Sequence, residues 1–149
     1  MRRILVAVDD SPASGRAVAF VNAFFRDEDI SITAVNVARV PVEWLPPTPY
    51  GGLYPWPWGP QGAGLMPEEA VERAEAEATV VATEHAPADA DVEVVFGEPV
   101  EAIERAAEET GADLIVVGSN HKTVLERALE GSVSQRLAKE TSWPLLVVP

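Results

Sequence analysis

Residues 113–148 read DLIVVGSNHKTVLERALEGSVSQRLAKETSWPLLVV, and this stretch decides how the chain is expected to fold. It begins and ends with short apolar runs, 113–117 and 144–148. Nearly continuous apolar runs of this length are typical of parallel strands that are covered on both faces. Between the runs, Ser132 precedes a helical pattern that extends to about Thr141. The stretch therefore predicts a strand, a helix and a second parallel strand.

The rest of the chain repeats this alternation. Runs at 4–8 and 32–38 have the same apolar character, whereas 92–96 alternates more and is expected at an edge of the sheet. Three further stretches show helical spacing of apolar residues: 12–24, 66–86 and 99–110. The order of elements predicts a doubly wound α/β fold, with a five-stranded parallel sheet, right-handed crossovers and helices on both faces.

Local signals support the three earlier helices. Ser11 is expected to cap the first, with Pro12 at its first position, and Gly111 is expected to end the third. The apolar spacing of the first helix runs through Ala13, Ala17, Phe20, Val21 and Phe24. The inner stripe of the second is Ala70, Val71, Ala74, Ala78, Val81 and Ala82, and that of the third is Ala102, Ile103 and Ala106.

Length and composition bound the class of protein. The 149 residues fit a single domain spanning 1–149, and 47% hydrophobic and 23% charged residues are an ordinary globular balance. Cysteine is absent, which excludes disulfides and thiolate metal sites and is compatible with a reducing cytoplasm. The apolar run 4–8 is stopped by Asp9 and Asp10, and no run approaches the ~20 apolar residues that span a bilayer. We therefore expect a cytoplasmic protein without membrane insertion.

The chain is strongly acidic. Its formal net charge is -13, with 24 acidic and 11 basic residues. Nucleic acids and anionic membranes bind through clustered cations, so neither is an expected partner. The charge would also repel a nucleotide triphosphate, so any such ligand must be held by donors within roughly 8 Å, the Debye length. Salt adaptation and a high-GC genome would each produce this composition.

Residues 41–64 interrupt the alternation. Seven of the 13 prolines, three of the four tryptophans and both tyrosines fall inside this segment. It has neither helical nor strand periodicity, which predicts a long insertion between the second strand and the second helix. Either it is a proline-rich loop that packs its own rings, or it is a lid or a surface for a partner, because clustered Trp and Tyr side chains are costly to expose.

Ligands of open α/β sheets bind beyond the carboxyl ends of the strands. Three segments reach this edge: 6–11, 36–40 and 116–134. In the last, Gly118 ends a strand with its amide exposed, and Gly131 and Ser132 begin a helix whose first amides lack intrahelical partners. The helix dipole adds about half a positive charge there. The segment therefore predicts a cradle for phosphate, although Ser132 and Gln135 also form a capping box, which needs no ligand.

These features together resemble a known family. The fourth strand is followed by a G-x-x-G-x9-G-[ST] pattern in which His121 replaces the second glycine, an aspartate ends the first strand, and a final apolar strand follows. From RRILVAVDDS to SWPLLVVP, and above all in GSVSQRLAKETSWPLLVV, the chain resembles the universal stress protein family. The resemblance implies a Rossmann-like sheet of strand order 3-2-1-4-5, homodimers formed through the last strand and, in one branch, bound ATP with Mg²⁺ held mainly by the phosphates. An exposed last strand would itself favour pairing with a second copy.

The resemblance also implies roles for individual residues. Asp9 would hold the ribose, although a carboxylate at this position would also cap the first helix. The pocket would be lined by Ala7, Val8 and Val117, with the Val37 backbone reading the adenine. The phosphate end would lie against Gly118, Asn120, His121, Gly131, Ser132, Val133 and Ser134.

His121 departs from the family pattern. The nucleotide-binding branch has glycine at this position, where an amide approaches the phosphates closely. Histidine adds a Cβ and a ring and disfavours positive φ. The imidazole would either donate to a phosphate beside Lys122 or fill the pocket and abolish binding. Because Gly131 and Ser132 are intact, whereas non-binding branches usually lose them, the sequence favours binding.

The sequence offers little catalytic machinery. His85 and His121 are the only histidines, so a histidine metal cluster is not expected, and His85 is expected to be exposed. Neither G-x-S-x-G nor G-x-x-x-x-G-K-[ST] occurs. No residue stands out to position an attacking water, so ATP hydrolysis is expected to be slow at most.

Three functional hypotheses follow from these observations. The first is a cytoplasmic, homodimeric stress-response protein that binds ATP as a regulatory ligand with little or no hydrolysis. The second is a nucleotide-free dimeric scaffold that contacts an unknown protein partner through residues 41–64. The third is an enzyme of the wider nucleotide-binding α/β group, such as an adenylyl transferase or a flavoprotein subunit, whose added catalytic signatures are not evident here. We expect the first.

Overall fold

The computed structural model describes residues 1–26, 29–38, 68–119 and 133–149. Strands and helices alternate in the predicted order: β1 (Arg2–Ala7), α1 (Pro12–Phe24), β2 (Ile30–Ala38), α2 (Glu68–His85), β3 (Asp91–Phe96), α3 (Pro99–Thr110), β4 (Leu114–Gly118), α4 (Val133–Glu140) and β5 (Leu145–Val148). The insertion predicted at 41–64 and the segment 120–132 lie outside the described residues.

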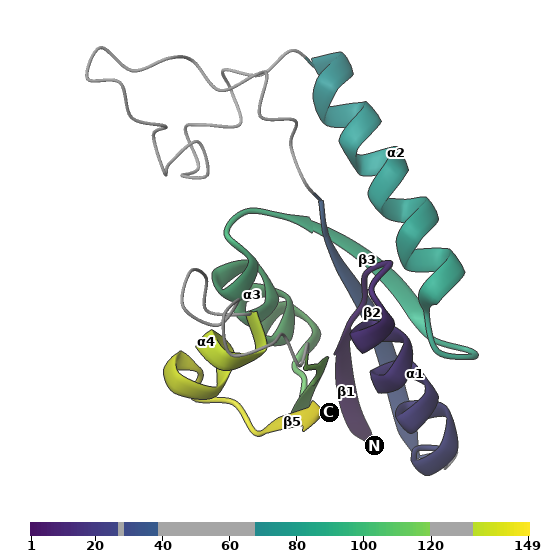
Figure 1. The fold of residues 1–149 in the computed structure, drawn as a ribbon, viewed down its shortest axis with the longest axis vertical. Coiled ribbons are helices and arrows are strands. Elements are labelled where there is room, and N and C mark those ends of the chain that lie inside the picture. The colour runs from purple at the N-terminus through teal and green to yellow at the C-terminus, as the bar shows by residue number, and fades with distance from the viewer. Residues whose placement is uncertain (27–28, 39–67, 120–132) are drawn as a thin grey trace.

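The five strands form one parallel sheet in the order β3-β2-β1-β4-β5 (Figure 1). The central strand β1 pairs on both sides, so Val6 lies opposite Ala34 of β2 and Val116 of β4. This order confirms the topology that the family resemblance implied. It also confirms the prediction that 92–96 forms an edge strand.

Helices cover the sheet on both faces, as its apolar strands predicted (Figure 1). α1 and α2 pack over a cluster that contains Val6 and Val116, and α3 and α4 pack over a cluster that contains Leu5, Ile115 and Leu137. Leu5 and Val6 belong to different clusters because successive residues of a strand point to opposite faces. Burial of each such side chain contributes about 1.5–3 kcal/mol, so each helical layer is held by several contributions of this size.

Local sequence determines where two of the helices begin and end. Ser11 caps α1, because its hydroxyl accepts a hydrogen bond from the Ser14 amide at 3.2 Å, and Pro12 occupies the first helical position. Gly111 follows α3 with a φ of 64°, a left-handed conformation that favours glycine. Both observations confirm the predictions from the sequence.

Two side chains differ from what helical spacing suggests. Phe24 continues the apolar spacing of α1 but is 69% exposed and stacks on Phe20, with ring centroids 4.5 Å apart. His85 is half-buried, and its Nδ1 donates to the Val81 carbonyl at 3.0 Å. The prediction of an exposed His85 is therefore wrong, because the preceding turn of its own helix gives the ring an acceptor.

Candidate functional site

The carboxyl ends of the strands form the edge at which this class of sheet binds ligands. Ala7, Val37 and Val117 lie there, at the ends of β1, β2 and β4. All three side chains pack with the cluster beneath α3 and α4, which also contains Leu137 of α4. Val117 is buried, and Ala7 and Val37 are half-buried. The structure therefore places three of the predicted pocket residues on one face of the sheet, the face that α4 covers.

Val8 lies beside Ala7 but faces the other side of the sheet. Its side chain packs in the cluster beneath α1 and α2. Its amide donates to the Val35 carbonyl at 2.9 Å, and its carbonyl accepts from Asn36 Nδ2 at 2.7 Å. Asn36 is only 7% exposed, and buried polar groups are almost always paired in this way. The Val8 side chain therefore faces away from the α4 face, and Asn36 holds its backbone in place.

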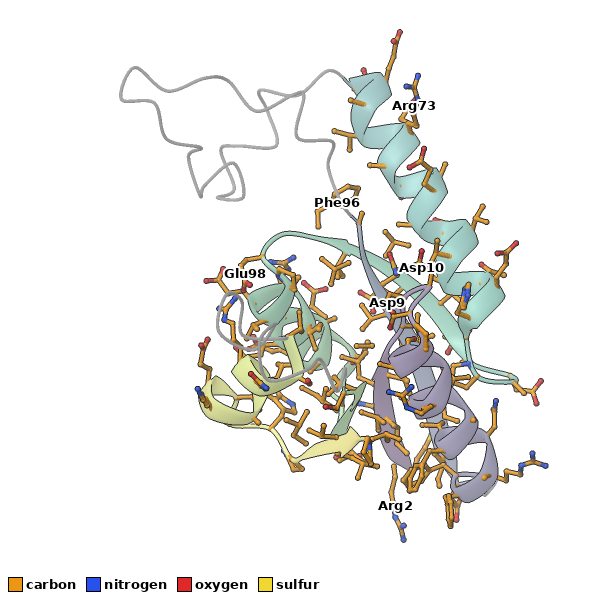
Figure 2. All side chains as sticks on the ribbon, in the orientation of Figure 1. Arg2, Asp9, Asp10, Arg73, Phe96 and Glu98 are labelled. Atoms are coloured by element: carbon orange, nitrogen blue, oxygen red, sulfur yellow. The ribbon has the colours of Figure 1, made fainter. Side chains whose placement is uncertain are left out.

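Asp9 lies at the junction of β1 and α1 (Figure 2). Its amide donates to Ser14 Oγ at 2.9 Å, and its Oδ1 accepts from the Ser11 amide at 2.8 Å. The carboxylate thus forms a local turn with the Ser11 amide just before α1, whereas the helix cap itself is Ser11. Its second oxygen, Oδ2, has no hydrogen-bond partner within the described ranges. One carboxylate can therefore hold the Ser11 amide through Oδ1 and still accept from a ligand through Oδ2.

Gly118 is the last residue of β4, where the sequence predicted a glycine that ends a strand. Its φ is not positive, so the backbone itself does not demand glycine. A Cβ atom here would lie 2.1 Å from the Ala13 carbonyl oxygen and 2.8 Å from the Ser14 nitrogen. Gly118 is required because the first turn of α1 lies directly against the end of β4.

Ser119 leads from β4 into the segment 120–132, and its backbone is held from two sides. Its amide donates to the Val148 carbonyl at 2.7 Å. Its carbonyl accepts from Arg16 of α1 at 3.0 Å, and the same guanidinium donates to the Pro149 carbonyl at 2.9 Å. Arg16 thereby joins α1, the end of β5 and the residue that precedes the predicted phosphate-binding segment.

The helices differ in how their first turns are occupied. The Glu98 carboxylate caps α3, because Oε2 accepts from the amides of Val100 at 3.1 Å and Glu101 at 3.3 Å. α2 begins with Glu68 and Glu69. The first turn of α4 contains no acidic residue. Helix amino termini favour negative charge, and α3 already satisfies its amides with its own carboxylate. Of these three helices, α4 is the one whose first turn brings no acidic side chain of its own.

The predicted phosphate contacts are described only in part. Val133 is the exposed first residue of α4, and Ser134 after it is buried. The remaining predicted contacts of this segment lie outside the described residues: Asn120, His121, Gly131 and Ser132. The choice between a phosphate-binding and a pocket-filling His121 therefore stays a prediction.

Arg136 of α4 links two carboxylates. Its guanidinium forms ion pairs with Glu98 of α3 and, at 3.3 Å, with Glu140 one turn further along α4. The hydrogen bond to Glu140, then that to Glu98, raises the pKa of Arg136 above its ordinary value, so the side chain stays charged. The start of α3 is thus tied to α4 by charged side chains.

Five residues at this edge were not identified from the sequence: Ser14, Arg16, Asn36, Glu98 and Arg136. Arg16, Asn36 and the Glu98–Arg136 pair make contacts between residues far apart in the chain, and Arg16 and Ser119, for example, are 103 positions apart. Two local signals were available. Asn36 is a polar residue inside the apolar run ITAVNVA, and Glu98 directly precedes Pro99, which opens a helix. Glutamate is not among the preferred N-cap residues, which made the second signal weak.

Two further features bear on the class of protein. Among the described residues, no group of three or more His, Cys, Asp or Glu side chains is placed to hold a metal ion. No helix in the described ranges is long and apolar enough to cross a membrane.

The strand order and the edge just described define a Rossmann-like α/β domain. The model of the universal stress protein family matches residues 1–149, and the chain belongs to that family. It is 30% identical over 149 residues to a universal stress protein of Mycobacterium tuberculosis, covering 97% of this chain and 47% of that protein. It is 36% identical over 84 residues to the stress response protein NhaX of Bacillus subtilis, covering 56% of this chain and 50% of that protein. The chain spans about half the length of these curated relatives.

Solved structures of similar proteins share the fold. A universal stress protein in complex with cAMP has a TM-score of 0.58 at 24% identity, covering 99% of this chain and 96% of its own. A family protein of Arabidopsis thaliana with AMP bound has a TM-score of 0.58 at 16% identity, with coverages of 99% and 91%. A universal stress protein of Archaeoglobus fulgidus in complex with dAMP has a TM-score of 0.54 at 19% identity, with coverages of 100% and 98%. At these identities the likeness establishes the fold.

Proposed function

We propose that this chain binds an adenine nucleotide, ATP with Mg²⁺, at the carboxyl edge of its sheet. The observation that carries the proposal is the placement of Ala7, Val37 and Val117 on the face that α4 covers. The same edge also carries a carboxylate oxygen of Asp9 and the start of α4, whose first turn has no acidic residue. An apolar surface with a few placed polar groups is the usual composition of a small-molecule site. The cAMP, AMP and dAMP bound by proteins of the same fold support the adenine moiety.

The proposed roles divide the nucleotide into three parts. Asp9 accepts from the ribose hydroxyls through Oδ2 while Oδ1 accepts from the Ser11 amide. The adenine lies over the side chains of Ala7 and Val117, with the backbones of Val8 and Val37 nearby. The phosphates lie against these residues: Gly118, Asn120, His121, Gly131, Ser132, Val133 and Ser134. Mg²⁺ is held mainly by the phosphates and supplies charge neutralisation there.

In this proposal ATP is a regulatory ligand and not the substrate of a fast enzyme. Hydrolysis of ATP needs a residue that orients the attacking water. The sequence offers no evident candidate for that role. The family name supplies the stress-response setting, and a cytoplasmic location agrees with the absence of cysteine.

The proposed active form is a homodimer that pairs through β5. This strand lies at one edge of the sheet, and Val147 is 37% exposed. An edge strand presents unpaired backbone donors and acceptors, and pairing with a second copy covers them. Native mass measurement at micromolar concentration is expected to give the dimer mass, and a strictly monomeric protein would contradict this part of the proposal.

Titration calorimetry with MgATP tests the proposed site. Wild type is expected to give saturable heat, and Asp9→Asn is expected to weaken binding roughly tenfold, because a charge-assisted hydrogen bond to the ribose is lost. Asp10→Asn is the matched control, because Asp10 is the exposed neighbour. Absence of saturation at millimolar MgATP would reject nucleotide binding, and equal losses in the two variants would reject the role of Asp9.

The nucleotide-free scaffold is a second candidate because His121 stands where the nucleotide-binding branch has glycine. In this candidate the protein partner binds residues 41–64. A His121→Gly variant that binds MgATP, beside a wild type that does not, would favour the scaffold. Native mass spectrometry of the purified protein gives an independent answer, because a co-purified nucleotide would exclude a nucleotide-free state.

A further inference from the structure

α4 is attached to the rest of the domain by few buried side chains. It has eight residues, of which Ser134 and Leu137 are buried, and it packs on α3 and β5. Leu137 is fully buried in the cluster beneath α3 and α4. Leu137 and Ser134 hold the inner side of α4, and a second contact on its outer side further restricts how the helix can tilt. The direction of its first turn therefore depends in part on this second contact.

Glu98 provides that second contact, and its carboxylate is itself fixed. Oε2 accepts from the amides of Val100 and Glu101 at the start of α3, and Oε1 accepts from Arg136 of α4. Figure 2 shows Glu98 at the start of α3. Exposed ion pairs are usually weak because two mobile side chains must both be ordered. Here the backbone of α3 already orders one partner, so less entropy is lost when Arg136 binds it.

The geometry distinguishes a positioning role for Arg136 from direct phosphate binding. Its guanidinium contacts two carboxylates, Glu98 and Glu140, so its positive charge is already matched. The Arg136 side chain is 40% exposed and that of Glu98 is 22% exposed, so both belong to the surface of the edge and not to the core. Removing their contact would leave the buried clusters intact and change how the start of α4 is directed.

We propose that the Glu98–Arg136 pair is a positioning pair that directs the first turn of α4 toward the phosphate end of the bound nucleotide. This inference rests on the proposed function, because it assigns the start of α4 to the phosphates. Ala7, Val37 and Val117, which lie against the adenine in the proposed site, belong to strands and not to α4. Loss of the pair therefore weakens ATP binding while binding of adenosine, which has no phosphates, is unchanged.

Calorimetry with ATP and with adenosine tests this selectivity on three variants. Arg136→Met keeps the apolar stem and removes both ion pairs, and Glu98→Gln keeps an oxygen that can accept from Val100 and Glu101. Each is expected to weaken ATP binding roughly fivefold and to leave adenosine affinity unchanged. Glu140→Gln is the matched control, because it removes only the exposed contact within α4, and less than a twofold change is expected. Equal losses for ATP and adenosine, or no loss for ATP, would overturn the proposal.

The double variant and hydrogen exchange complete the test. Arg136→Met combined with Glu98→Gln is expected to bind ATP as weakly as either single variant, because both remove the same contact, and additive losses would overturn the pairing. Hydrogen exchange of the backbone amides, measured without nucleotide, tests the Glu98–Arg136 contact independently of ligand binding. The amides of α4 are expected to exchange faster in Arg136→Met than in wild type or Glu140→Gln, and those of α3 are expected to be unchanged. A wild type that binds neither ligand rejects the proposed function, whereas unchanged α4 exchange rejects the positioning pair.

Discussion

Replacing Gly118 with alanine tests how closely α1 approaches the end of β4. The added Cβ atom would lie 2.1 Å from the Ala13 carbonyl oxygen, 2.3 Å from its carbonyl carbon and 2.8 Å from the Ser14 nitrogen. Ordinary van der Waals contact begins at 3.4 Å, so the first turn of α1 must retreat by more than about 1 Å. Because the opposing atoms belong to the backbone, no rotamer change relieves the contact.

The cost of this retreat exceeds that of ordinary overpacking. Moving the start of α1 disturbs the buried face that Ala17 and Val21 present to the sheet. Overpacking that side chains can absorb costs about 1–3 kcal/mol, so we expect Gly118→Ala to lower the free energy of unfolding by roughly 3 kcal/mol or more. For a chain of this size that corresponds to about 6–12 °C in Tm. Urea unfolding followed by circular dichroism measures the change.

Gly15→Ala is the matched control, because Gly15 lies in α1, the helix that the Gly118 substitution would displace. A Cβ atom at Gly15 meets nothing within 4 Å, and alanine is favoured over glycine inside a helix by about 1 kcal/mol. This variant is therefore expected to be more stable than wild type. If Gly118→Ala unfolds at the same urea concentration as wild type, the close approach of α1 to β4 is refuted.

Three further substitutions test two hydrogen bonds near the carboxyl ends of the strands and one carboxyl group on β3. Asn36→Leu leaves the Val8 carbonyl without its donor and is expected to cost about 1–3 kcal/mol in urea unfolding; a loss near zero would show that this carbonyl finds another partner. Ser14→Ala removes the hydroxyl that accepts from the Asp9 amide, and it is expected to lower the free energy of unfolding by about 1 kcal/mol in the same assay. An unchanged urea midpoint would argue against this hydrogen bond. Burial, with repulsion from Glu109, raises the pKa of Glu93 above its ordinary value of 4.5. A carboxyl whose pKa rises on folding favours the folded state at low pH, and this contribution disappears as pH rises through the folded pKa. Glu93→Gln is therefore expected to be stabilising at pH 7 and nearly neutral at about pH 3, and a difference that does not vary with pH would contradict this assignment.

The sequence predicted the elements because their causes are local. Buried parallel strands are apolar throughout, and Ser11, Pro12 and Gly111 act on backbone within a few residues of themselves. The strand order came from the family resemblance, since five apolar runs by themselves allow several orders. His85 was misplaced because spacing does not show when a side chain turns back to its own helix.

The candidate site was predictable where it lies on strand ends and was missed where distant residues meet. The segments 6–11, 36–40 and 116–134 follow from the strand ends, the family resemblance implied Ala7, Val37 and Val117 within them, and the structure places these three on one face. Gly118 was predicted as the end of a strand, but the close approach of the α1 backbone, which leaves no room for a Cβ atom there, was not predicted. Arg136 and Glu98, 38 positions apart, meet only once α3 and α4 have packed. The residues next to Glu98 and those next to Arg136 in the sequence do not indicate such a contact.

The separation of the two apolar clusters has a consequence for how this protein can be altered. The apolar side chains assigned to the adenine, those of Ala7 and Val117, pack with the cluster under α3 and α4, whereas Ile4, Val21 and Ala82 belong to the one under α1 and α2. Substitutions in the cluster under α1 and α2 are therefore expected to change the stability of the domain with little effect on its ligand preference. A library that randomises only those interior positions would be expected to yield variants with a wide spread of melting temperatures and one common affinity.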